Sequence, residues 1–111
     1  MSQQTALEKV KAALTSIGSV TVKHYFGTGI PAPYIIWAEE SEDDHFAGDG
    51  HEDGATTGTI DLFTQTEYDP LKKQVETALD AAGIAWYLNS TQYEDETGLI
   101  HHEWVWSVED G

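Results

Sequence analysis

Cysteine and arginine are both absent from this sequence of 111 residues. Without cysteine the chain has no disulfide bond, no thiolate metal ligand and no cysteine nucleophile, so its fold must be held by its core or by partners. Five lysines stand against 20 aspartates and glutamates, which gives a formal net charge of −15. Because proteins hold phosphate with clusters of lysine and arginine, this balance excludes a surface that grips nucleic acid or anionic lipid over a large area. The protein either avoids DNA or surrounds it without specific binding.

Long apolar runs are missing as well. No segment approaches the roughly 20 consecutive apolar residues that a membrane-spanning helix needs, so we expect no membrane partner. The start of the chain, Met1 to Thr5, has neither a basic flank nor an apolar run of signal-peptide length. We therefore expect the protein in the cytoplasm of the cell that makes it.

Apolar material for a core is nevertheless present. Hydrophobic residues make up 40% of the sequence and include four tryptophans, beside five tyrosines and three phenylalanines, so the chain is not of the disordered class. Its length fits one domain, and neither an internal repeat nor a linker divides it. We predict a single domain over residues 1–111.

Helical spacing of apolar residues appears in two segments. The first predicted helix covers about 4–17 and is followed by Gly18. The second covers about 70–82, where Asp69 is a typical N-cap, Pro70 suits the first helical position and Gly83 ends the helix.

Strand-like segments surround these helices. Alternating, β-branched or aromatic runs predict strands at 20–25, 34–38, 57–66, 84–93 and 99–108, the last two joined as an antiparallel hairpin. The resulting order, α-β-β-β-α-β-β, predicts an α+β fold: a two-layer sandwich with a mainly antiparallel sheet and two helices on one face.

An acidic, glycine-rich segment at about 39–58 interrupts this pattern and predicts a loop. Its carboxylates and imidazoles are weak candidates for metal ligands, although the calcium-loop register fails: counting from Asp43 or Asp49, the twelfth residue is Gly54 or Ile60 rather than glutamate. A solvated charged loop is the favoured interpretation, so we predict no metal and no cofactor, with a metal- or ligand-binding module as the alternative. The candidate ligands are Asp43, Asp44, His45, Asp49, His51 and Asp53.

No catalytic motif stands out. The adjacent His101 and His102 should point to opposite faces of a strand, so they do not easily share one ion. We expect His101 to lie beside Glu103 and His102 to be half-buried beside Trp104. The sequence has no G-x-S-x-G nucleophile motif, and its glycine pairs lead neither into a phosphate-binding helix nor into a basic loop. We therefore predict that the protein is not an enzyme.

The large aromatic residues are the remaining candidates for function. Base stacking by the tryptophans would need a basic groove, which the composition does not supply, so core or subunit-interface packing is favoured. The predicted oligomer or partner contacts are Phe46, Tyr34, Trp37, Trp104 and Trp106.

Several ordered segments resemble one family. They are the Gly29-Ile-Pro-Ala-Pro-Tyr-Ile-Ile-Trp37 strand, the acidic segment with Asp44-His-Phe46, the Thr59-Ile-Asp-Leu-Phe-Thr64 strand, the Asp-Pro-opened helix and the terminal Trp104-Val-Trp106 strand. The sequence resembles the small tail-completion proteins (tail-terminator or head–tail joining proteins) of long-tailed bacteriophages and prophages.

This resemblance implies a ring of identical subunits, commonly a hexamer, that caps the finished tail tube and faces the head connector. Its partners would be further copies of itself and the tail tube and head connector proteins, with DNA passing through unbound. It would assemble in the bacterial host cytoplasm and end in the tail or neck of the virion. A further alternative is an inhibitor whose acidic surface mimics nucleic acid.

Overall fold

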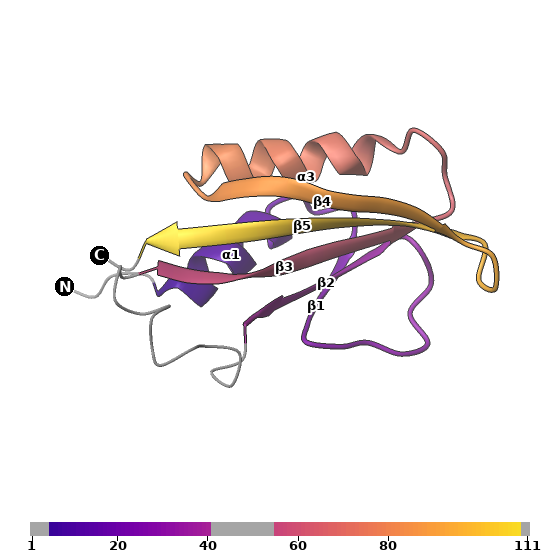
Figure 1. The fold of residues 1–111 in the computed structure, drawn as a ribbon, viewed down its shortest axis with the longest axis horizontal. Helices are drawn as coiled ribbons and strands as arrows, with labels where there is room; N and C mark the ends of the chain where they lie inside the picture. Colours follow the sequence, from indigo (N-terminus) through magenta and orange to yellow (C-terminus); the bar gives the residue numbers. More distant parts are fainter. Residues whose placement is uncertain (1–4, 41–54, 110–111) are drawn as a thin grey trace.

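The computed structural model describes residues 5–40 and 55–109. Within these residues there are two helices and five strands, in the predicted order α-β-β-β-α-β-β. Figure 1 shows the strands side by side, with α1 behind them and α3 along the β4 side. The elements are α1 (Ala6–Thr15), β1 (Thr21–His24), β2 (Tyr34–Glu39), β3 (Ala55–Thr64), α3 (Pro70–Ala81), β4 (Ala85–Glu94) and β5 (Leu99–Glu109).

The described strands form one sheet in the order β1-β2-β3-β5-β4. β1 and β2 run parallel, while β2–β3, β3–β5 and β4–β5 are antiparallel. The hairpin of β4 and β5 inserts β5 beside β3 and leaves β4 as an outer edge. The predicted α+β fold with a mainly antiparallel sheet is confirmed.

Both helices bury their apolar stripes against the same face of the sheet. Val10 and Leu14 of α1 and Val75 of α3 have no exposed surface, and they belong to one core cluster with inward side chains of β2, β3 and β5. Alternation along β3 and β5 supplies that inner face, because every second side chain of a strand points the same way. The strand side chains in this core are Ile35, Trp37, Ile60, Leu62, Trp104, Trp106 and Val108.

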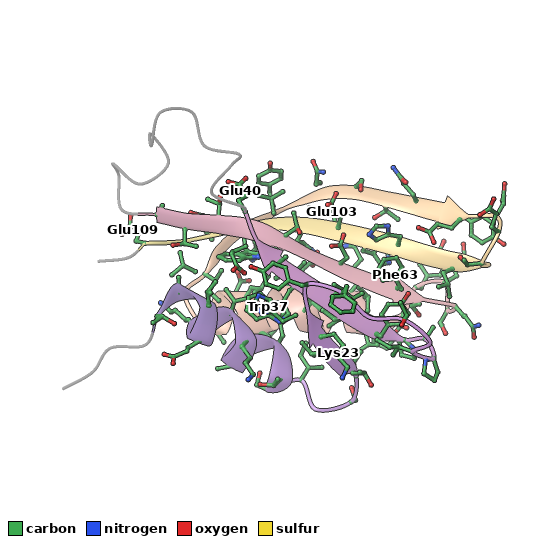
Figure 2. All side chains as sticks on the ribbon, turned by 90° about the horizontal axis from the view of Figure 1, so that it is seen from below. Lys23, Trp37, Glu40, Phe63, Glu103 and Glu109 are labelled. Atoms are coloured by element: carbon green, nitrogen blue, oxygen red, sulfur yellow. The ribbon has the colours of Figure 1, made fainter. Side chains whose placement is uncertain are left out.

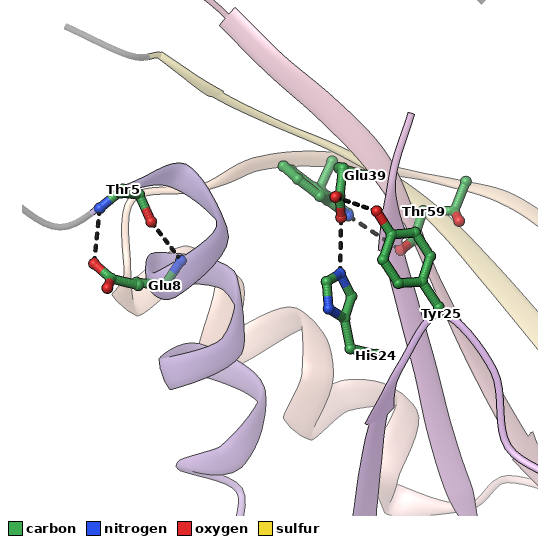
Figure 3. Close-up of polar contacts among 7 residues, drawn as sticks. Thr5, Glu8, His24, Tyr25, Glu39 and Thr59 are labelled. Atoms are coloured by element: carbon green, nitrogen blue, oxygen red, sulfur yellow. Dashed lines mark hydrogen bonds and ion pairs between the residues drawn. The ribbon is translucent and has the colours of Figure 1, made fainter. Parts of the chain in front are cut away.

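Side-chain caps fix where each helix begins. Thr5 accepts a hydrogen bond from the Glu8 backbone N–H, and the Glu8 carboxylate accepts one from the Thr5 backbone N–H, which is a capping box (Figure 3). Asp69 accepts from the Leu71 N–H at the start of α3, as predicted, and also accepts a hydrogen bond from the Thr64 hydroxyl. The second contact ties the helix start to the end of β3.

Some predicted boundaries shift by a few residues. The acidic loop expected at 39–58 is shorter at both ends, because Glu39 is still in β2 and β3 already begins at Ala55. Pairing with β5 explains the longer strand, since Ala55 lies opposite Glu109. The strand expected to run to residue 66 ends at Thr64, whose hydroxyl accepts from the Thr66 N–H and turns the chain toward Asp69.

Candidate functional site: the open face of the sheet

The side of the sheet opposite the helices has no other described element packed on it. We call it the open face. Its side chains on β2, β3 and β5 are mostly half-buried, whereas most of those on the edge strands β1 and β4 are exposed. Their positions follow from the strand registers. The open face includes Thr21, Lys23, Tyr34, Ile36, Ala38, Ala55, Thr57, Thr59, Asp61, Phe63, Ala85, Tyr87, Ser90, Gln92, Glu94, Leu99, His101, Glu103, Val105, Ser107 and Glu109.

A row of stacked aromatic rings crosses three strands of the open face. Tyr34, Phe63 and His101 lie directly opposite one another in the β2–β3 and β3–β5 registers. The Tyr34 and Phe63 ring centroids are 4.8 Å apart, and those of Phe63 and His101 are 4.2 Å apart, both stacked. In Figure 2, which views the molecule of Figure 1 from below, Phe63 is the labelled residue of this row. Such cross-strand pairs stabilise the sheet and hold the three rings in place against one another.

His101 also joins two carboxylates across the open face. Its Nε2 lies 2.7 Å from Asp61 Oδ1, and its Nδ1 lies 3.4 Å from Glu94 Oε2. The hydrogen bond to Asp61 raises the pKa of His101, against burial, which lowers it, and with further help from the surrounding negative charges. Glu103 shares the face of His101, as predicted, but its carboxylate accepts a hydrogen bond from Asn89 at 3.0 Å.

The adjacent His102 points to the core, as predicted. It is 8% exposed and lies 6.1 Å, centroid to centroid, from the Trp104 ring, with its Nδ1 2.9 Å from the Thr91 hydroxyl. Burial lowers its pKa, and the positive charge of Lys72 adds to that shift.

A mainly apolar row crosses the open face, separated from the stacked rings by the row that contains Asp61 and Glu103. Ala38, Thr59, Val105 and Tyr87 are opposite one another across β2, β3, β5 and β4. The Tyr87 side of this row is the more accessible, because β4 is an edge strand and 57% of Tyr87 is exposed. The open face therefore combines apolar contact area with carboxylates held in place by hydrogen bonds.

A second polar cluster lies at the β1 edge of the sheet, between the end of β1 and the end of β2. Glu39 accepts hydrogen bonds from His24 Nε2 at 2.8 Å and from the Tyr25 hydroxyl (Figure 3). The His24 ring is stacked between Tyr25 and Trp37, with centroid distances of 4.1 and 4.0 Å. Tyr25 adopts a left-handed backbone (φ 78°), a conformation that an aromatic residue holds only under local constraint.

The electrostatics of this edge cluster follow from its contacts. Burial raises the pKa of Glu39, but the hydrogen bonds from Tyr25 and His24 outweigh it, so the pKa lies below its ordinary value. The hydrogen bond between the Tyr25 hydroxyl and Glu39 raises the pKa of Tyr25. Because both carboxylate oxygens are engaged, Glu39 serves as a structural tie between β1 and β2 and not as a free base.

The buried carboxylate under the sheet is satisfied as well. Glu76 on α3 accepts from Trp104 Nε1 at 3.1 Å and from Lys72 Nζ at 3.2 Å. In residues 5–40 and 55–109 every buried side-chain polar atom has a hydrogen-bond partner. The same residues contain no group of three or more histidines and acids arranged to hold a metal ion.

The predicted site residues separate into three groups. Asp43, Asp44, His45, Phe46, Asp49, His51 and Asp53 all lie outside the described residues. Tyr34 lies on the open face, as a partner contact requires. Trp37, Trp104 and Trp106 are 3%, 0% and 0% exposed within a single chain, so they are core residues and offer no surface to a partner. For these three the core interpretation holds, and the contact prediction is corrected.

Sequence reasoning missed Tyr87, the Asp61–His101 pair and the Glu39 cluster. The alternation of β4 does show that Tyr87 points to the other face of the strand from Trp86 and Leu88. Only the sheet order shows that no described element covers the face on which Tyr87 lies. His24 and Glu39 are 15 residues apart, and nothing in their spacing signals the contact.

No model of a known protein family matches this sequence, and no curated protein matches it either. Neither of the two helices in the described part of the chain is long and apolar enough to cross a membrane.

Proposed function

We propose that this protein is a structural assembly protein of long-tailed bacteriophages, a tail-completion, tail-terminator or head–tail joining protein that acts by self-association and docking. In this role it forms a ring of identical subunits, docks on the tail tube and presents a surface to the head connector. It assembles in the host cytoplasm and remains in the tail or neck of the virion.

The observation that carries the proposal is the open face. Over the described part of the chain it is a broad sheet surface on which two rows with apolar side chains flank a row that contains Asp61 and Glu103, and no described element covers it. Exposed apolar area beside polar groups is typical of protein–protein contacts. A surface of this kind supports docking to other subunits.

The polar clusters favour a structural role over a catalytic one. Asp61 is engaged with His101, and Glu39 with His24 and Tyr25, so these acid–histidine pairs brace neighbouring strands. A general base needs a free site toward its substrate. These contacts support a protein that works through its surface.

The charge and the sequence resemblance support the phage assignment. The net charge of −15 suits a ring that DNA slides through without being held, because carboxylates repel phosphate. The resemblance covers strands and helices along nearly the whole chain, including the Gly29–Trp37 segment that leads into β2.

The test joins microscopy with genetics. The purified full chain is examined by light scattering and negative-stain electron microscopy, and its gene is deleted from the phage or prophage that carries it. We expect closed rings, and tails of abnormal length or unjoined to heads, restored by a plasmid copy. Persistent monomers together with normal-length, head-joined tails in the deletion strain would refute the proposal.

A further inference from the structure

We infer that subunits associate head to tail, with the open face of one copy packed on the two helices of the next copy and Tyr87 inserted between those helices. This inference rests on the proposed function, since it names the two surfaces through which the ring would form. In this arrangement the open face is covered by a second copy of this chain.

Charge is unevenly divided between the two layers. Four of the five lysines lie on the helices, where the acids are Glu8, Glu76 and Asp80. Lys72 is paired with Glu76, and Lys9, Lys11 and Lys73 have no ion pair among residues 5–40 and 55–109. The open face carries acids against a single lysine, Lys23. These acids are Asp61, Glu94, Glu103 and Glu109.

This division selects a head-to-tail contact. Two open faces brought together would oppose carboxylates to carboxylates, and like charges across an interface cost several kcal/mol. An open face against a helix layer opposes carboxylates to lysines. A contact between two different surfaces of the same chain is heterologous, and it closes into a ring when its rotation allows.

The helix layer offers a receiving site for a side chain. A shallow groove of about 310 Å³ lies between the end of α1 and the middle of α3. The small residues Ala78 and Ala81 line it together with Ile17, which adds apolar surface, and with Lys73 and Thr77 on α3. A phenol ring suits such a site because its body is apolar and its hydroxyl can stay near a polar rim.

Tyr87 is the open-face residue best placed to fill this groove. It is 57% exposed and stands next to Val105 on the cross-strand row. Tyrosine is among the residues that most often dominate binding energy in interfaces. The two longer dimensions of the molecule are 40 and 31 Å, which leave room for the roughly 800 Å² per partner of a standard interface.

The experiment uses one variant for each surface. Tyr87→Lys removes the aromatic anchor and opposes a new cation to Lys73. Thr77→Glu places a carboxylate in the groove, opposite the acidic face, and improves helix propensity, so that α3 is retained. Self-association is measured by analytical ultracentrifugation, and folding by circular dichroism. We expect each variant to associate at least about tenfold more weakly than the unaltered chain.

Mixing the two variants separates a head-to-tail contact from a symmetric one. The Tyr87→Lys chain keeps an intact helix layer and the Thr77→Glu chain keeps an intact open face, so together they should form a one-to-one dimer that grows no further. Neither variant should form this species alone. A symmetric open-face contact predicts instead that Thr77→Glu associates normally and that mixing adds nothing.

Matched controls keep the result specific. Tyr93→Lys makes the same change on β4, on the opposite side of the sheet, at a residue that is 65% exposed. Thr28→Glu makes the same change in an exposed loop. Both should associate like the unaltered chain. Rings that survive Tyr87→Lys and Thr77→Glu would overturn the inference and leave the proposed function standing. A chain that stays monomeric without substitutions overturns the inference, while normal tails in the deletion strain overturn the function.

Discussion

Gly58 stands where the sheet has no room for a side chain. It faces the core on β3, opposite Trp106, and a Cβ built there would lie 2.1 Å from the Ala38 carbonyl oxygen and 2.5 Å from Cζ2 of Trp106. The first of these neighbours is backbone and cannot rotate away. The glycine therefore allows the Trp106 ring to approach β3 closely, where its Nε1 donates to the Thr59 carbonyl oxygen at 3.1 Å.

Substitution of Gly58 should accordingly be costly. We expect Gly58→Ala to lower the free energy of unfolding by about 3 kcal/mol, because overpacking must displace backbone as well as a tryptophan. Urea denaturation followed by tryptophan fluorescence measures the change. Gly98→Ala is the control: its φ is 72° and no atom lies within 4 Å of a built Cβ, so only the left-handed penalty of about 1–2 kcal/mol applies. Equal losses in the two variants would contradict this account.

His101 should stabilise the fold mainly at low pH. Its pKa is raised in the folded state, chiefly by Asp61, so its contribution is fully present below the unfolded pKa, near 6.5, and is lost as the pH rises through the folded value. We expect His101→Gln to lower the free energy of unfolding more at pH 5.5 than at pH 9. Denaturant titrations of both chains at both pH values measure this difference, and a loss independent of pH would argue against it.

His102 should behave in the opposite sense. Burial lowers the pKa of His102 in the folded state below its value in the unfolded chain. When the pH falls below that unfolded value, the unfolded chain binds more protons than the folded chain, so the stability of the fold decreases. We expect His102→Gln to cost less stability at pH 5.5 than at pH 9, in the same titrations. In the unaltered chain, protonation of His101 therefore stabilises the fold and protonation of His102 destabilises it, because His101 faces carboxylates and His102 faces the core.

At the scale of elements, the start of α3 depends on one side chain with two tasks. Asp69 caps the Leu71 N–H and also accepts from Thr64 at the end of β3. We expect Asp69→Ala to cost about 2 kcal/mol, the upper end for a lost cap, because the buried Thr64 hydroxyl loses the acceptor of its hydrogen bond too. Thermal and urea unfolding measure the loss. Glu67→Ala, an exposed acid in the same loop, is the control and should change stability by less than about 0.5 kcal/mol.

The elements were largely predictable because their signals are local. Asp69-Pro70 marks the start of α3, and the alternation of Ile60, Leu62 and Thr64 marks the inner face of β3. The strand ends were less predictable. Ala55 and Thr56 lie beside a glycine-rich acidic stretch, and their strand conformation follows from pairing with Glu109 and Val108 of β5, far along the chain.

The candidate site was predictable only in part for the same reason. Tyr34 lies on the open face, but its role as a contact residue stays a prediction. For the tryptophans the sequence leaves core and contact roles open, because alternation shows that residues share a face without showing which face the helices cover. The sheet order β1-β2-β3-β5-β4 decides this, and with it the exposure of Tyr87. Long-range order, not local pattern, defines the open face.

At the scale of the whole molecule, a net charge of −15 should make stability depend on salt. The Debye length falls from about 30 Å at 0.01 M salt to about 8 Å at 0.15 M, so repulsion across a molecule 40 Å long is progressively screened. We expect the melting temperature to rise over this range when measured at a concentration that keeps the chain monomeric. A double variant, Asp95→Asn with Glu96→Gln, has two fewer negative charges at the exposed hairpin turn and should show a smaller rise. A melting temperature insensitive to salt in both chains would count against this expectation.

Within the described residues, the helices carry four lysines against three acids and the open face carries four acids against one lysine, so these two layers differ in charge. Two diffusing copies would then be rotated by each other's field before they touch, with unlike layers turned inward. Such steering acts on the encounter rate more than on the lifetime of the complex. The speed at which subunits find one another would therefore be set by the ionic strength of the cell as much as by their number.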